Sequence, residues 1–447
     1  MKEKNKIKLI DIILIIVLII ALSVVFSGFK KNNFNDFSKA ELYANKSEFK
    51  RDNKVKYSKM DSYKIESEEF NDAMIHKKIE VTPNTAYKLT CMVKTENIIT
   101  ENAVSNGGVL ICVADTVEQS KALTGTHDWE KLEFLFNSKN RTSIDIGFRL
   151  GGNEDNAKGT VWFSDFTLES GTISEDNNWN MACFILENID VKVDNVNVNL
   201  TMSDNDIETV KDNMERFKNT FNGLSNDKIN IKYDIYKVQE PLKTLSYDEE
   251  NGYYVSPKDV EGLINDVITK KEYDHIFIVV RFGNEFNRNQ IKVRDWIGLG
   301  GMDYYGIGFS NIRLPDSNSS YLYTYNPERN TFPEEVWVHE FLHTLERNQK
   351  ELGYYVPALH DNEKYGYYNQ RLVGLYDWYK DYMRKNIEDK EALQKIGLID
   401  KVYITKPIHP SNFSYTLDQT SKVFSEPQNV FQEFAAVFKS IGRALKI

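Results

Sequence analysis

Two histidines separated by one helical turn are the residues of this chain best suited to chemistry. His339 and His343 lie four positions apart in the segment His-Glu-Phe-Leu-His. On a helix, both imidazoles project from one face and can reach a single zinc ion. Glu340, beside the first histidine, is placed to take a proton from a zinc-bound water. The pattern therefore predicts a metallohydrolase with Glu340 as its general base.

The sequence on either side of the histidines predicts the helix that positions them. Thr331-Phe-Pro-Glu334 has the spacing of a capping box with proline in the first turn, and Gly353 marks a C-terminal stop. Between these ends, Trp337, Phe341 and Leu345 form an apolar stripe that indicates a buried helix. The alternative is an ordinary amphipathic helix on which two histidines happen to stack.

A catalytic zinc site needs a third protein ligand, and two downstream residues compete for that role. His360 follows an extended stretch that can return toward the metal, which would give three histidines. Glu363 lies twenty residues after His343, a spacing similar to that of thermolysin-type peptidases. Glu346 shares the histidine face one turn further on, and we expect it to bond to a ligand rather than to the metal.

The region before the histidines alternates helices and strands in an order that resembles a zincin, the zinc-peptidase fold. In that fold the last strand before the histidine helix forms the sheet edge and pairs with an extended substrate. Glycines at Gly298–Gly301 are interpreted as a tight turn. The expected helices are Asp204–Phe221 and 256–269, and the expected strands are Lys228–Val238, Asp274–Arg281, Gly306–Ile312 and Tyr321–Tyr325.

The zincin resemblance implies a mechanism and further site residues. Zinc would polarise the scissile carbonyl, and Glu340 would pass a proton from the attacking water to the leaving amine. Tyr365 and Tyr367 are candidates for the hydrogen bond to the transition-state oxyanion, as a tyrosine provides in several zincin families. The chain departs from the metzincin branch, because Gln349 stands where that branch has its third histidine.

A separate all-β region is expected between residues 56 and 172. Its candidate strands are short, alternate in polarity and are separated by turn residues, which predicts a β-sandwich. They are Lys77–Val81, Ala86–Thr95, Gly108–Asp115, Glu130–Asn137, Ser143–Leu150 and Thr160–Leu168.

Three segments of this region are similar to landmarks of jelly-roll carbohydrate-binding modules. They are Val81–Glu96, Gly125–Phe134 and Gly159–Glu169. The resemblance implies a jelly-roll fold, in which a structural Ca²⁺ and a glycan ligand are open alternatives. Trp129 and Trp162 are interpreted either as core residues or as platforms on which a sugar stacks.

The N-terminus predicts export. Met1–Lys8 is basic, and Ile12–Phe29 is apolar over 18 residues. Such a helix is roughly 27 Å long, which just spans a bilayer core. The lysines would remain cytoplasmic and place the rest of the chain outside. An uncleaved single-pass anchor is preferred, and a cleaved signal peptide is the alternative.

Composition excludes some classes of function. The net charge of −10 argues against a nucleic-acid partner. Cys91, Cys112 and Cys183 are too few for a disulfide framework or a cysteine-ligated metal site.

We therefore expect a multi-domain chain with five segments. These are a membrane anchor or signal segment (1–30), a linker (31–55), a jelly-roll domain (56–172), an α+β zincin-like domain (175–410) and a C-terminal helical extension (411–447). The predicted activity is an extracellular, membrane-anchored zinc metallopeptidase acting on a protein, a glycoprotein or the cell envelope. The alternatives are a surface adhesin or glycan-binding protein with an inactive zincin-like domain, and a zinc hydrolase acting on another acyl group.

Overall fold

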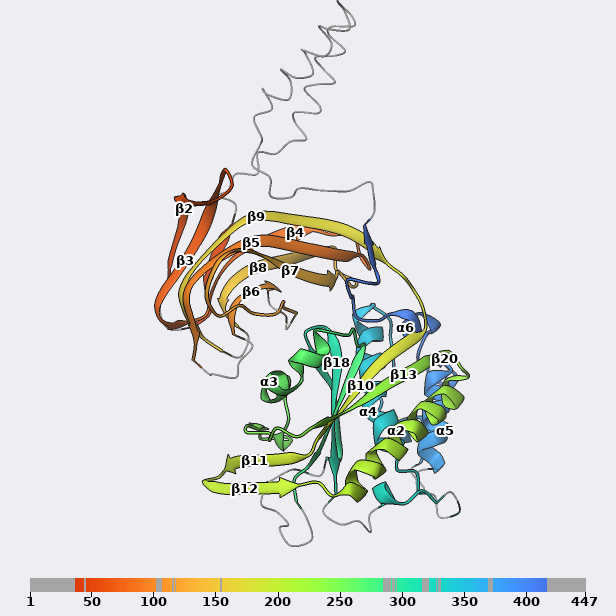
Figure 1. The fold of residues 1–447 in the computed structure, drawn as a ribbon. Coiled ribbons are helices and arrows are strands. Elements are labelled where there is room, and N and C mark those ends of the chain that lie inside the picture. Colours follow the sequence, from red (N-terminus) through yellow and green to blue (C-terminus); the bar gives the residue numbers. More distant parts are fainter. Residues whose placement is uncertain are drawn as a thin grey trace, which may run out of the picture.

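The computed structural model of the protein shows a β-sandwich followed by an α/β domain (Figure 1). It describes residues 37–415 apart from 44–45, 102–106, 115, 117, 153–154, 284–290, 292–293, 295, 316–320, 327, 329–330 and 369–372. The predicted anchor at 1–30 and most of the predicted C-terminal extension at 411–447 lie outside these residues. Within the described part of the chain, no helix combines the length and apolar character needed to cross a membrane.

The sandwich consists of two antiparallel sheets, with strand orders β1-β4-β8-β6 and β2-β3-β9-β5-β7. Successive strands from β3 to β9 alternate between the sheets, which is a jelly-roll arrangement and confirms the predicted fold of this region. The strands are β1 (Ser38–Glu41), β2 (Glu48–Tyr57), β3 (Met60–Asn71), β4 (Ala73–Glu80), β5 (Ala86–Thr100), β6 (Gly108–Val113), β7 (Gly125–Asn137), β8 (Ser143–Gly151) and β9 (Ala157–Ile173).

Alternating side chains build the core between the two sheets. On β5, Leu89, Cys91 and Val93 are buried in this core, whereas Lys88, Met92 and Lys94, which alternate with them on the other face, are only partly buried. This two-residue period is what a strand with one face on the core requires. The predicted linker at 31–55 is wrong in its C-terminal part, because β1 and most of β2 lie there and pair with β4 and β3.

The second domain is built on a five-stranded sheet of order β13-β10-β16-β18-β17. Four strands are parallel, and only β17 at the edge runs antiparallel to its neighbour β18. The strands of this sheet are β10 (Asn178–Leu186), β13 (Asn230–Val238), β16 (His275–Arg281), β17 (Gly298–Tyr304) and β18 (Ile307–Leu314).

Helices cover one face of this sheet and a helix with two hairpins covers the other. Phe217 of α2 and Phe341 of α4 pack on the first face, where Trp179 and Phe277 project from the sheet. The helices are α2 (Asp204–Ser225), α3 (Pro257–Ile268), α4 (Glu335–Glu351), α5 (Val373–Met383) and α6 (Asp400–Ile404). The two hairpins are β11 (Asn188–Val193) with β12 (Val196–Thr201) and β14 (Ser246–Asp248) with β15 (Gly252–Tyr254). A third hairpin, β19 (Ile387–Asp389) with β20 (Gln394–Ile396), packs with the helices of the first face.

Three local predictions in this domain are wrong. Gly298–Gly301 is part of strand β17 rather than a turn, and Tyr321–Tyr323 form a short 3₁₀ helix rather than a strand. The histidine helix begins at Glu335 without a side-chain cap, because the Thr331 hydroxyl donates to the Asn326 carbonyl instead. The predicted stop is confirmed, since Gly353 follows the helix with a φ of 82°.

The C-terminal end of the described chain returns to the sandwich. Strand β21 (Phe413–Tyr415) pairs with the end of β9, with Phe413 opposite Ile173. Lys139 of the sandwich also forms an ion pair with Glu351 of α4 at 3.0 Å. The sandwich is thus attached to the far end of the histidine helix.

Candidate metal centre

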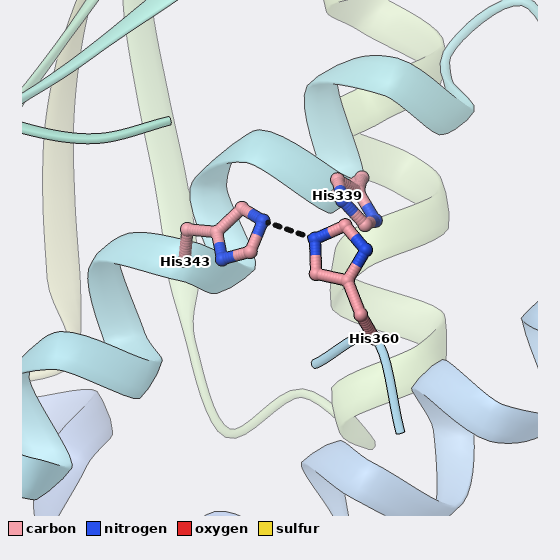
Figure 2. Close-up of side chains that lie close together, drawn as sticks. All are labelled: His339, His343 and His360. Atoms are coloured by element: carbon pink, nitrogen blue, oxygen red, sulfur yellow. Dashed lines mark hydrogen bonds between the residues drawn. The ribbon is translucent and has the colours of Figure 1, made fainter. Parts of the chain in front are cut away.

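Three histidines converge at the mouth of a cleft in the α/β domain. His339 and His343 project from α4, and His360 approaches them from the loop that follows this helix (Figure 2). Their ligand nitrogens all lie within 4.8 Å of one another. The Nε2 atoms of His343 and His360 are 3.1 Å apart.

The loop that carries the third histidine is fixed to helix α5. The chain reverses at Gly353, whose positive φ is a conformation that glycine adopts without strain. The Trp378 indole then donates a hydrogen bond to the Leu359 carbonyl at 2.9 Å. The Tyr382 hydroxyl donates to the Pro357 carbonyl at 3.1 Å. These buried hydrogen bonds hold the backbone immediately before the third histidine.

The alternative third ligand does not join this group. Glu363 is exposed and opens the 3₁₀ helix η4 (Glu363–Tyr365). Among the described residues, the three histidines are the only set of potential ligands close enough to hold one ion. The geometry thus favours His360 over Glu363.

A carboxylate orients the second histidine of the helix. The Nδ1 atom of His343 lies 3.1 Å from Glu346 Oε2, and Lys350 donates to Glu346 Oε1 at 2.6 Å. Burial would raise the pKa of Glu346, but its hydrogen bonds with His343 and Lys350 hold that pKa below the ordinary value. With Nδ1 facing a carboxylate, the Nε2 lone pair of His343 is available to a metal.

The first histidine is oriented by a tyrosine. The Nδ1 atom of His339 lies 2.9 Å from the Tyr379 hydroxyl, which donates to Glu335 at 2.5 Å. Burial and the neighbouring His343 and His360 lower the pKa of His339 to about 3. Metal binding requires a neutral imidazole, so this environment fits a ligand.

Three clustered imidazoles fit zinc in particular. Partial burial and the neighbouring His343 also lower the pKa of His360. Three nitrogen donors with a fourth position left open form the donor set of a catalytic zinc site. The residues present therefore fit the predicted metal.

Glu340 lies beneath the edge strand. Its side chain is 5% exposed, and a Cβ added at Gly300 would lie 2.6 Å from its carbonyl oxygen. Burial and the charge of Glu335 raise the pKa of Glu340 well above the ordinary value, against a hydrogen bond from the Gly300 backbone. A carboxylate with a raised pKa is suited to accept and return a proton near neutral pH.

A cleft of about 340 Å³ runs past the histidines. His339, His360 and Glu340 line it on one side together with Tyr379. Its apolar lining residues are Ile297, Val336, Leu359 and Leu375. A substrate group in this cleft would contact both the candidate metal ligands and the candidate base.

The two predicted oxyanion donors are engaged elsewhere. The Tyr365 hydroxyl lies 3.2 Å from that of Tyr355, and the Tyr367 hydroxyl donates to Asp381 at 2.6 Å. Neither tyrosine lines the cleft. Neither hydroxyl contacts a histidine of the site. The tyrosine that does is Tyr379, which lines the cleft and bonds to His339.

Sequence reasoning missed Glu335 and Tyr379. A weak signal existed for Glu335, because it lies four residues before His339 and so shares its helix face. Tyr379 carried no signal, because it lies on another helix forty residues downstream. Its proximity depends on how α5 packs against α4.

No protein-family model and no curated protein matches this chain. Among solved structures, the enzymatically active domain of tailspike protein 4 of bacteriophage CBA120 is similar at 11% identity and a TM-score of 0.24. That match covers 31% of this chain and 20% of the tailspike chain. This chain therefore spans about a fifth of the tailspike's length.

Carbohydrate-binding modules also match. TmCBM61, solved with β-1,4-galactotriose, matches at 15% identity and a TM-score of 0.22 over 31% of this chain and 92% of its own. The CBM22-1 xylan-binding domain of Paenibacillus barcinonensis Xyn10C matches at 13% identity and a TM-score of 0.20, over 30% of this chain and 85% of its own. These values are too low to carry an argument, and the jelly-roll assignment rests on the strand order.

Proposed function

We propose that this protein is a zinc metallopeptidase with His339, His343 and His360 as metal ligands and Glu340 as general base. The observation that supports it most directly is the convergence of three imidazoles from two separate segments beside a buried glutamate. If the two helix histidines merely stacked on an ordinary amphipathic helix, there would be no reason for a third histidine from another segment to lie beside them.

The residues divide the chemistry between them. A zinc ion held by these three imidazoles would polarise a carbonyl and lower the pKa of its bound water. Glu340 accepts a proton from the attacking water and returns it to the leaving amine, and its buried carboxylate has a raised pKa that suits both steps. The apolar side chains of the cleft, Ile297, Val336, Leu359 and Leu375, provide a surface for the apolar part of a substrate.

The edge strand supports a peptide as the substrate. In the sheet, β17 pairs with β18 on one side and has no strand partner on the other among the described residues. An extended peptide can add to such an edge through backbone hydrogen bonds. Gly298 and Gly300 of this strand adjoin Glu340, so a peptide bound there would pass the candidate base.

The N-terminal sequence supports placing this activity outside the cell. Its lysines precede an apolar run long enough to span a bilayer core. A peptidase held at the membrane would act on proteins or glycoproteins at the cell surface, including the cell envelope.

The substitution Glu340→Gln tests the proposal. It keeps the size of the side chain but removes the proton acceptor, so turnover should fall by about 10²–10⁴-fold while bound zinc is retained. Cleavage of an unfolded protein and zinc content by mass spectrometry measure the two quantities. The matched control is Glu363→Gln, which should keep both. Wild-type cleavage rates in Glu340→Gln, or a wild-type protein without stoichiometric zinc, would contradict the proposal.

A second candidate function is glycan binding by the sandwich. Trp129 is partly exposed and lies 5.7 Å from the partly exposed Tyr57 ring. Such aromatic faces are surfaces on which a sugar ring can stack. Trp162 is less suited, because it is 6% exposed and its indole donates to Asp52 at 3.1 Å.

Trp129→Ala tests this second function. Affinity electrophoresis in gels containing plant or bacterial polysaccharides should show retardation of the wild type and not of the variant. Trp162→Phe is the matched control and should remain retarded. Absence of retardation of the wild type across the polysaccharides would count against glycan binding and leave the peptidase proposal untouched.

A further inference from the structure

We propose that Tyr379 and Glu335 are positioning residues that fix the tautomer of His339 so that its Nε2 atom faces the metal. This inference rests on the proposed function, because it assumes that the three histidines bind zinc. It assigns a role to two buried residues that do not themselves reach the ion.

The three side chains form one hydrogen-bonded chain. Glu335 and His339 project from neighbouring turns of α4, and Tyr379 reaches them from α5. The Tyr379 hydroxyl is 2.5 Å from Glu335 Oε1 and 2.9 Å from His339 Nδ1. One hydroxyl thus joins a carboxylate to a candidate ligand.

The number of protons on the three side chains determines which group donates in each of these two hydrogen bonds. A tyrosine hydroxyl has one proton to donate, whereas a carboxylate can only accept. Tyr379 therefore donates to Glu335, and its oxygen accepts from the Nδ1–H of His339. A neutral imidazole with its proton on Nδ1 has a free lone pair on Nε2, which is the form that binds zinc through Nε2.

Burial makes this chain hard to replace by water. Tyr379 is fully buried and Glu335 is 8% exposed. In such an environment hydrogen bonds are electrostatically stronger than in water, and a lost partner is costly. Without the hydroxyl, His339 would lose the acceptor that holds its proton on Nδ1 and fixes the ring plane.

The neighbouring tyrosine provides an internal control. Tyr376 lies one turn earlier on α5 and donates to Glu334 at 3.2 Å. The two tyrosines thus lie on successive turns of α5 and bond to adjacent glutamates, Glu334 just before α4 and Glu335 at its first position. In the described part of the chain, the Tyr376 hydroxyl bonds to Glu334 and to no histidine.

The test compares Tyr379→Phe with Tyr376→Phe in the full chain. Each variant loses one hydroxyl, and only the first loses the acceptor of a candidate ligand. Zinc affinity is measured by competition with a chromophoric chelator, and Co²⁺ is substituted to follow its visible spectrum. Tyr379→Phe should bind zinc about 10–100-fold more weakly, as loss of an outer partner of a ligand does, and shift the Co²⁺ bands. Tyr376→Phe should retain wild-type affinity and spectrum.

Thermal unfolding of the metal-free proteins separates positioning from general stability. Similar unfolding temperatures for the two variants, with zinc affinity lost only in Tyr379→Phe, would support the inference. Wild-type zinc affinity in Tyr379→Phe, or an equal loss in both variants, would overturn it. A wild-type protein that binds no zinc would overturn the proposed metal site itself, and the two failures are thus distinguishable.

Discussion

The third histidine is the residue that completes the candidate site. Two histidines of one helix leave a zinc ion short of protein ligands, and His360 supplies the missing nitrogen at the mouth of the cleft. Its competitor Glu363 is only three residues away but is exposed and outside the group. The sequence allowed either a site of three histidines or a site of two histidines and Glu363, and the geometry favours the first.

Replacing His360 should therefore remove most of the zinc affinity. His360→Ala deletes a ligand, so its effect should exceed the 10–100-fold loss typical of outer partners and reach at least about 100-fold. Glu363→Ala should bind zinc like the wild type. Isothermal titration of the metal-free proteins with zinc measures both. The reverse pattern, with affinity lost only in Glu363→Ala, would return the site to the thermolysin-like arrangement.

Spacing predicted that His339 and His343 lie together and named His360 as one of two residues that could join them, because both features depend on local chain geometry. His339 and His343 follow from the helical period, and His360 follows from a helix stop and a short extended return. Tyr379 could not be found in this way, because its contact with His339 depends on the packing of two helices. Tyr365 and Tyr367 follow from the zincin resemblance, but the fold directs their hydroxyls to Tyr355 and Asp381.

At the scale of elements, the approach of strand β17 to helix α4 determines how Glu340 is buried. Gly298 and Gly300 have no side chain, so the strand lies directly on the helix. The glycines were interpreted as a turn because glycine is usually a sign of one. In the fold, these glycines instead allow the backbone of β17 to approach the backbone of α4 closely, and a strand interior can require glycine where another backbone comes near.

Gly300→Ala should separate the strand from the helix. The added Cβ would lie 2.6 Å from the Glu340 carbonyl oxygen, so the backbone must shift at a cost of about 1–3 kcal/mol in the free energy of unfolding. Peptidase activity should fall together with stability. The control is Gly262→Ala on α3, where nothing lies within 4 Å of the new atom. That change should be neutral or stabilise by up to about 1 kcal/mol. Chemical denaturation measures both, and equal stabilities would show that the close approach is unimportant.

Among the described residues, the sandwich and the α/β domain are connected by a strand pairing and by an ion pair. Strand β21 adds to the end of β9, and Lys139 pairs with Glu351 of the histidine helix. The ion pair is partly exposed and should contribute no more than about 1 kcal/mol. The strand pairing is therefore the more important attachment.

Gly171→Val should loosen that attachment. A Cβ at this position would lie 2.5 Å from the Phe413 ring, so β21 must move away. The backbone amide hydrogens of β21 should then exchange with deuterated solvent roughly tenfold faster, because local opening becomes less costly. Lys139→Ala serves as control and should leave this exchange nearly unchanged. An exchange rate of β21 that does not respond to Gly171→Val would argue against the role of β21.

The division into domains was predictable, but their attachment was not. Alternating polarity indicates the sandwich strands, and the buried run of β16 indicates a central strand, because both patterns are local. The sequence of β1 and β2 predicts a linker because most of its residues are polar, and in the fold those side chains face solvent and little of either strand enters the core. The return of β21 involves a pairing between residues far apart in sequence, for which no local pattern exists.

The central claim is that three histidines bind one zinc ion beside Glu340. A crystal structure of the zinc-loaded protein, with anomalous diffraction recorded on both sides of the zinc absorption edge, tests it most directly. We predict one strong anomalous peak bonded to His339, His343 and His360 at about 2.0–2.1 Å, with Glu340 facing the open coordination position. A peak bonded to Glu363 in place of His360, or no peak at the three histidines, would contradict this account.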